Sequence, residues 1–374
     1  MIEAVRMSDD TKSEPARYLV PVPSLGVPGP WPIGRVVIHP GNDAAPLLAN
    51  TPPAGDPDGH VARRVQEVLA SADKGSVAVV PGGELDAALD ELAAALDALR
   101  LFQLSRRVTH ETTFGLPGDL YSSPIEYVAV WDRAAFGWRF RGDHAGWTFD
   151  AESFAAWSAS KAFTFLSEAL AADAPSEAQR RAIAGTRLLS RAALDHQADL
   201  KMIGIASALE SWLLERDSGS QTYRLARLAS WFSCGVGSEH RCGNPATAAA
   251  CPYLNLDPVS RRDRQRLAVL RSIGIPGSFW RCAEWHRIVD WYGARSGAAH
   301  GEWAAVDLKD AESAEYWVSH YLAPPILEWL ADHREQPVAD LEAAIRAAAD
   351  PTAVESMRAA LDEDPPPVRP PLDP

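Results

Sequence analysis

The sequence predicts an α+β N-terminal domain followed by an all-helical domain, and three observations carry this prediction. The 374 residues exceed the usual size of one domain, which favours two. Short β-type runs punctuated by proline and glycine mark the first part of the chain. From residue 150 onward, apolar residues recur at the three- and four-residue spacing of amphipathic helices. The predicted bounds are 1–148 for the α+β domain, whose role would be sensing or regulation, and 150–349 for the helical domain.

The N-terminal domain is predicted from short strands and one long helix. Strands are expected at 18–22, 35–38, 76–80, 125–131 and 137–141, the last two as a pair. Prolines inside or beside the first two runs indicate edge strands or loops. Pro81-Gly82-Gly83 turns the chain into an amphipathic helix over about 84–102.

The second domain is predicted to be a series of helices. They are expected at about 154–171, 177–216, 221–233, 259–272, 279–295, 309–332 and 337–349. Ser176 is the expected N-cap of the second helix, because its hydroxyl can accept a backbone N–H of the first turn. Residues 234–257 are expected to be irregular, and 362–374 to form a Pro-rich disordered tail with no means of packing.

The composition restricts where the protein works and what it binds. No apolar run approaches the roughly 18 residues that a membrane helix needs, and the polar N-terminus lacks the apolar core of a signal peptide. A soluble cytoplasmic protein with no membrane partner is therefore expected. The net charge of -14 argues against a surface coated by nucleic acid, but it leaves room for a local basic groove. Five arginines between 261 and 271 either track an RNA backbone or form a solvated helix face.

The leading site candidate is the pair Arg295 and His300 in the segment YGARSGAAHG. The Arg-x4-His spacing alone is expected about once by chance in a chain of this composition, so its setting must carry the argument. Arg295 shares one helical face with Ile288, Trp291 and Tyr292, which indicates that it projects from an apolar stripe.

His300 lies about 140° further round an unbroken helix than Arg295, since each residue turns about 100°. The two side chains converge only if the helix ends or bends between them, and Gly297 and Gly301 supply the means. The alternative is structural: Arg295 caps the helix C-terminus and His300 lies in the following loop.

The residue types suit cleavage of a phosphodiester bond. Histidine passes a proton near neutral pH, and the arginine fork matches a phosphate and the charge that builds on it. Attack by a ribose 2′-OH on its own phosphate would leave a cyclic phosphate and needs no metal. No cofactor for catalysis is therefore expected.

The longer string Tyr292-x2-Arg295-Ser296-x3-His300-Gly301 resembles the signature of the HEPN superfamily, in particular its Apea-like branch. The segment ALESWL, which contains Glu210, resembles the acid-bearing helix of that branch, and the resemblance covers roughly 177–332. It implies a helical bundle that dimerises so that two Arg–His pairs face one composite cleft. It also implies a metal-independent endoribonuclease of a kind often found in toxins and anti-phage systems.

The resemblance also implies residue roles. His300 would be the acid and base, Arg295 the ligand of the phosphate and of the transition state, and Glu210 a third member that orients Arg295. Glu210 lies in an otherwise apolar stripe of its own helix, which agrees with an inward-facing acid. The expected partners are RNA, a second copy of the chain, and an unidentified trigger or antitoxin. Some family members have lost catalysis, so a non-catalytic dimerisation or binding module is the alternative.

Three cysteines and a histidine cluster in one segment, C-x5-H-x-C-x8-C, formed by Cys234, His240, Cys242 and Cys251. Three cysteines and one histidine are a suitable ligand set for a closed structural zinc site, with Cys282 as an alternative to His240. The spacing differs from the usual C-x2-C knuckle, and reduced cysteines also pack as small apolar residues. Such a zinc would be structural, because four protein ligands leave no open position.

Overall fold

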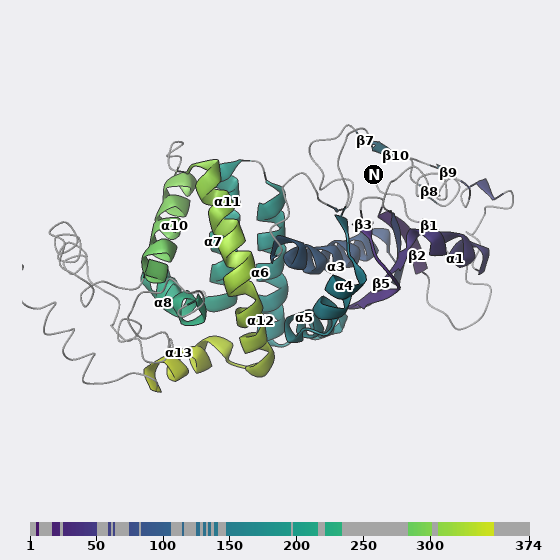
Figure 1. The fold of residues 1–374 in the computed structure, drawn as a ribbon. Helices are drawn as coiled ribbons and strands as arrows, with labels where there is room; N and C mark the ends of the chain where they lie inside the picture. Colours follow the sequence, from purple (N-terminus) through teal and green to yellow (C-terminus); the bar gives the residue numbers. More distant parts are fainter. Residues whose placement is uncertain are drawn as a thin grey trace, which may run out of the picture. The chain divides into compact units, whose positions relative to one another are not determined.

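The computed structural model divides into two compact units, Met1–Leu194 and Asp195–Pro374 (Figure 1). The residues it describes are 5–6, 17–22, 25–50, 59–60, 63, 75–81, 84–105, 114–115, 125–127, 130–131, 134–135, 138–140, 147–195, 197–215, 221–233, 283–300 and 306–347. The N-terminal part is α+β and the remainder is helical, as the sequence predicts.

A five-stranded antiparallel sheet organises the first unit, with strand order β1-β2-β6-β5-β4. Its strands are β1 (Val5–Arg6), β2 (Arg17–Val22), β6 (Ser76–Pro81), β5 (Val36–Pro40) and β4 (Trp31–Ile33). The smaller pairs are β3 (Leu25–Gly26) with β11 (Trp147–Thr148), β7 (Ile125–Tyr127) with β10 (Trp138–Phe140), and β8 (Val130–Trp131) with β9 (Ala134–Ala135). The runs predicted at 18–22, 35–38 and 76–80 correspond to β2, β5 and β6, and 125–127 pairs with 138–140 as predicted. Within the run predicted as one strand over 125–131, however, Val130–Trp131 pairs with Ala134–Ala135.

The predicted edge position is wrong for β5, which lies between β6 and β4. Its neighbour β4 is the edge strand, and Pro32 sits there because an edge position needs no second ladder bond. Pro21 is tolerated in β2 for a related reason. It pairs with Val77 of β6 on one side, whereas the described part of β1 reaches only Tyr18 and Leu19 on the other.

The first unit also contains helices. They are α1 (Ala44–Asn50), which follows the short η1 (Gly41–Asp43), and α3 (Leu85–Ser105), α4 (Ala151–Ser158), α5 (Lys161–Ala171) and α6 (Glu177–Leu194). Helix α3 packs against β5 and β6, α5 against β4, and α6 against α3 and α5. The predicted single helix over 154–171 is two helices, because the Ser160 hydroxyl accepts the Phe163 N–H at 3.1 Å and starts α5 afresh.

The change in composition near residue 149 marks where helices begin, but the first compact unit continues to Leu194. Helices α4 to α6 complete the core of the sheet unit. A buried polar cluster ties α6 to α3: Arg100 donates to Ser190 and, at 2.9 Å, to Asp97, and Ser190 donates to Asp97 at 2.6 Å. Arg100 also donates to the Phe114 carbonyl at 2.5 Å. A buried arginine needs such partners, so this cluster fixes α6 within the first unit.

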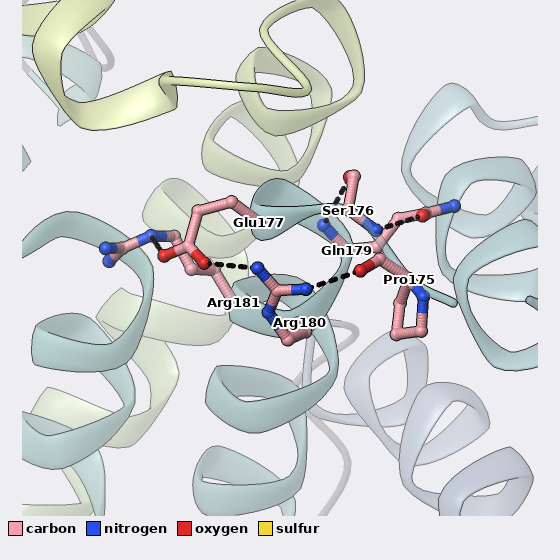
Figure 2. A network of polar contacts seen from close by, with 6 residues as sticks. All are labelled: Pro175, Ser176, Glu177, Gln179, Arg180 and Arg181. Atoms are coloured by element: carbon pink, nitrogen blue, oxygen red, sulfur yellow. Dashed lines mark hydrogen bonds and ion pairs between the residues drawn. The ribbon is translucent and has the colours of Figure 1, made fainter. Parts of the chain in front are cut away.

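The start of α6 is a reciprocal capping box, as Figure 2 shows. The Ser176 hydroxyl accepts the Gln179 N–H at 3.3 Å, and the Gln179 side chain accepts the Ser176 N–H at 2.8 Å. Ser176 is therefore the N-cap that the sequence predicts. Glu177 pairs with Arg180 and Arg181 at 2.9 and 2.8 Å, and these contacts lower the pKa of its carboxyl, the hydrogen bond from Arg180 most of all.

Helices alone make up the described part of the second unit. They are α7 (Ala198–Leu213), α8 (Gln221–Ser233), α10 (Ala283–Ala299), α11 (Leu308–Trp317), the π-helical η5 (Val318–Leu322), α12 (Ala323–Asp332) and α13 (Pro337–Ala347). Helix α7 packs against α10 and α11, and α8 packs against α10 and α13 (Figure 1). None of the helices described is long and apolar enough to cross a membrane.

Two predicted helices differ from the structure in detail. The helix expected over 177–216 is interrupted between Leu194 and Ala198, where the Asp195 carboxylate accepts the Gln197 N–H at 2.9 Å. This local bond competes with helix formation. The stretch expected over 309–332 is helical throughout but contains η5, whose Ser319 hydroxyl donates to the Glu315 carbonyl at 2.6 Å.

Candidate active site

Helix α10 carries the candidate site and packs against α7 and α8. Ile288 and Tyr292 are buried on its inner face, and Arg295 follows one turn later with 28% of its side chain exposed. The spacing therefore identified the buried face correctly: Arg295 emerges from the margin of an apolar stripe.

Glu210 of α7 is the partner of that face. Its Oε1 accepts the Tyr292 hydroxyl at 2.6 Å, and its Oε2 lies 3.5 Å from Nη2 of Arg295. The Arg295 guanidinium also lies 5.3 Å from the Tyr292 ring centroid. With 21% of its side chain exposed, Glu210 is screened from bulk water enough to keep the arginine close. The structure thus brings together Glu210 and Arg295, which the sequence places 85 positions apart.

Gln221, at the start of α8, completes the network and was missed from the sequence. Its amide group lies 3.1 Å from the Tyr292 hydroxyl oxygen. A phenol has one proton to donate, and Glu210 receives it over the shorter distance. Exchanging the oxygen and nitrogen of the Gln221 amide places its NH₂ group next to the phenol oxygen. In that orientation Gln221 donates a hydrogen bond to Tyr292. Nothing in the local pattern singles out Gln221, because its partner Tyr292 lies on another helix, 71 positions further along the chain.

The network changes the acidity of Tyr292. Burial raises its pKa to about 12, and the hydrogen bond to Glu210 and the negative charge of that carboxylate act in the same direction. Arg295 opposes them with a lowering effect. At neutral pH Tyr292 therefore keeps its proton and donates it to Glu210.

His300 stands apart from this network. Helix α10 continues past Arg295, where the sequence predicts its end, to Ala299, and the His300 N–H bonds the carbonyls of Ser296 and Gly297, each at 3.1 Å. The continuous backbone leaves His300 about 140° round the axis from Arg295. His300 is exposed, whereas Arg295 is half-buried.

The arrangement therefore offers two separate chemical groups at one end of α10. One is a cation oriented by Glu210 and suited to a phosphate. The other is an exposed imidazole suited to proton transfer. On an ideal helix the positions of these two residues lie about 140° apart around the axis.

The zinc ligands expected at Cys234, His240, Cys242 and Cys251 lie outside the described residues, as does Cys282. The same holds for the helix expected at 259–272 with its arginines, for Gly301, and for the tail at 362–374.

The chain was compared with protein families, curated proteins and solved structures. No family model, curated protein or solved structure matches the chain.

Proposed function

We propose that this protein is a metal-independent endoribonuclease of the HEPN type that works as a dimer. The observation that supports this most is the half-buried Arg295–Glu210 pair, at 3.5 Å, on the helix that also carries the exposed His300. The resemblance of the string from Tyr292 to Gly301 supplies the reaction class. Under this proposal the protein is a toxin or anti-phage effector, and its first unit senses a trigger or restrains the nuclease.

The chemistry follows from the two groups. His300 accepts the proton of a ribose 2′-OH, and the resulting oxygen attacks the adjacent phosphorus. The bond from phosphorus to the 5′ oxygen breaks, leaving a 2′,3′-cyclic phosphate and a 5′-OH that takes up a proton. Arg295 binds the phosphate oxygens as their negative charge builds, and Glu210 holds the guanidinium in place.

The angle between Arg295 and His300 argues for a second copy of the chain. Their divergence of about 140° places them on different sides of one helix end. Two copies related by a two-fold axis would bring Arg295 of one copy towards His300 of the other. A dimeric site therefore accounts for the pair better than a monomeric one.

The first experiment measures cleavage of a single-stranded RNA by the purified full chain in the presence of EDTA. Wild type should cleave and leave a cyclic phosphate, and both Arg295→Ala and His300→Ala should lose at least a hundredfold of the rate. Leu308→Ala, an exposed position on α11, serves as the control and should retain activity. Equal rates for all four proteins would refute the assignment.

A second experiment tests the dimeric site. Arg295→Ala and His300→Ala chains, each inactive alone, are mixed and allowed to exchange subunits. A site built across two copies gives each mixed dimer one intact Arg–His combination, so activity should return. A mixture that stays inactive, although mixed dimers form, would place the site within one chain.

A non-catalytic dimerisation or binding module is the competing function, and the same network is the observation that favours it. Glu210, Tyr292, Arg295 and Gln221 join α7, α8 and α10, which is also what a purely structural cluster would do. In that case Arg295→Ala lowers the melting temperature and there is no ribonuclease activity to lose.

A further inference from the structure

A series of polar contacts connects the start of α8 with the Arg295 guanidinium. The Gln221 amide lies 3.1 Å from the Tyr292 hydroxyl oxygen, and that hydroxyl donates to Oε1 of Glu210 at 2.6 Å. The other oxygen of the same carboxylate lies 3.5 Å from Nη2 of Arg295. The proposed reaction gives roles to Glu210 and Arg295, and it leaves Gln221 and Tyr292 without one.

Glu210 and Tyr292 together set the direction of the Arg295 guanidinium. Within the described part of the chain, the Nε–H of Arg295 is buried and has no hydrogen-bond partner, so its contact with the Glu210 carboxylate carries the orientation. The Tyr292 ring adds a second contact, with its centroid 5.3 Å from the guanidinium carbon. Both contacts depend on one phenol, because the Tyr292 hydroxyl also holds Glu210. A shift of that ring would therefore move both supports of Arg295 together.

Gln221 is placed to fix the phenol end of the Tyr292 ring. It is the first residue of α8 and is exposed. One turn later, Arg224 forms ion pairs with Glu342 of α13 and, at 3.6 Å, with Glu215. These pairs anchor the first turn of α8. The Gln221 amide is therefore presented to Tyr292 from a fixed backbone, although its side chain lies at the surface.

The direction of the hydrogen bonds determines what Gln221 does. An amide NH₂ that donates to the phenol oxygen leaves the phenol proton for Glu210, and it strengthens the bond that this proton makes. We infer that Gln221 is a positioning residue of the proposed nuclease: its amide turns the Tyr292 hydroxyl towards Glu210, and the carboxylate thereby keeps its second oxygen on Arg295. The inference rests on the proposed ribonuclease function and gives α8 a part in orienting the phosphate-binding cation.

Three substitutions separate the two halves of the Gln221 amide. Gln221→Met keeps the length of the side chain and removes both hydrogen-bonding groups, Gln221→Glu keeps only acceptors, and Gln221→Lys keeps only donors. They are compared by steady-state cleavage of a fluorescent RNA oligonucleotide by the full chain in EDTA. Because Arg295 acts on charge that develops in the transition state, the loss should fall on kcat and leave KM nearly unchanged.

The three variants should differ in order as well as in size. We expect kcat to fall about fivefold in Gln221→Met, the size of effect typical of one net hydrogen bond. The fall should be larger in Gln221→Glu, because the new carboxylate competes with Glu210 for the phenol proton. Gln221→Lys should lose less than either, since its ammonium group can still donate to the phenol oxygen. Equal losses in the Glu and Lys variants would overturn the inference.

The orientation of Arg295 also has a readout that needs no RNA cleavage. Phenylglyoxal modifies accessible arginines, and peptide mapping of the treated full chain gives a rate for each one. Arg295 should react about twofold faster or more in Gln221→Met and Gln221→Glu than in wild type, because its guanidinium is held less closely against Glu210. The rate at Arg224, on the same helix as Gln221, should stay unchanged. A rise at both arginines would mean that the substitution loosens the helices in general, and would overturn the inference.

Gln197 provides the matched control. It is an exposed glutamine at the start of α7, and its side chain makes no capping bond. Gln197→Met and Gln197→Glu should match wild type both in kcat and in the labelling of Arg295. Wild-type kcat in Gln221→Met and Gln221→Glu, or unchanged labelling of Arg295 in them, would overturn the inference. Failure of the proposed function looks different: wild type would cleave no RNA, while the labelling of Arg295 would still respond to Gln221.

Discussion

Tyr292 of α10 donates its hydroxyl proton to Glu210 of α7 over 2.6 Å, and the other oxygen of the same carboxylate lies 3.5 Å from the Arg295 guanidinium. One carboxylate thus joins two side chains that lie three positions apart on a neighbouring helix. This relationship makes Glu210 the centre of the candidate site, and it fixes the position of α10 against α7.

The stability of the second unit should depend on that hydrogen bond. Tyr292→Phe removes the hydroxyl and keeps the ring, and we expect a loss of about 1.5–3 kcal/mol, the range for a hydrogen bond to a charged group. Urea unfolding of wild type, Tyr292→Phe, Glu210→Gln and the double variant measures this loss. The double variant should lose less than the two single variants together. Strict additivity would show that the two residues do not interact.

Tyr292 should also lose its phenol proton at an unusually high pH. Its pKa is raised from 10.0 to about 12 in the folded protein, so the folded state holds this proton more tightly than the unfolded state does. The resulting stabilisation is fully present below pH 10 and is lost as the pH rises through about 12. Phenolate absorbance followed against pH measures the pKa of Tyr292. The Tyr292→Phe variant should lose the part of the absorbance change that occurs near pH 12. Removal of amplitude near pH 10 instead would contradict the burial and hydrogen bonding described.

The capping box at the start of α6 gives a prediction for the first unit. Ser176→Ala should destabilise the protein by about 1 kcal/mol, because it leaves the Gln179 N–H without its side-chain acceptor. Thermal unfolding measures the effect, and Ser176→Asp, which restores an acceptor, is the matched control. A melting temperature for Ser176→Ala equal to that of wild type would mean that solvent replaces the cap at no cost.

The buried ion pair between Lys201 of α7 and Glu315 of α11 should behave unlike an exposed one. Glu315→Gln leaves a buried lysine without its carboxylate and should cost about 3–5 kcal/mol. Glu177→Gln, in the exposed pair with Arg180, should cost no more than about 1 kcal/mol. Adding Lys201→Met to Glu315→Gln should recover part of the loss. Urea midpoints compare the four proteins, and similar losses for both single variants would show that burial does not strengthen the Lys201 pair.

Periodicity in the sequence determined most of the helices. The repeats predicted α3, α8 and α13 nearly to their ends, and the face shared by Ile288, Tyr292 and Arg295 is the buried face of α10. The acid within the apolar stripe of α7 likewise pointed to Glu210. These predictions are correct because a helix that is buried on one side needs apolar residues at three- and four-residue spacing, and this spacing is visible in the sequence.

The tertiary structure decided what those faces meet. Helices α4 to α6 have the same kind of periodicity as the helices that follow, yet they belong to the first unit. Helix α5 packs against β4, and Ser190 of α6 binds Arg100 of α3. Gln221 joins the candidate site only because α8 packs beside α10.

The Arg295–His300 pair shows the same division. The sequence supplies both residues, together with Gly297 between them and Gly301 directly after His300. The structure shows that α10 does not bend there, since the His300 N–H continues the helical hydrogen-bond pattern. The local sequence pattern predicts which residues a helix buries and where its backbone could bend. The packing of α10 against α7 and α8 determined which of those allowed conformations the chain adopts.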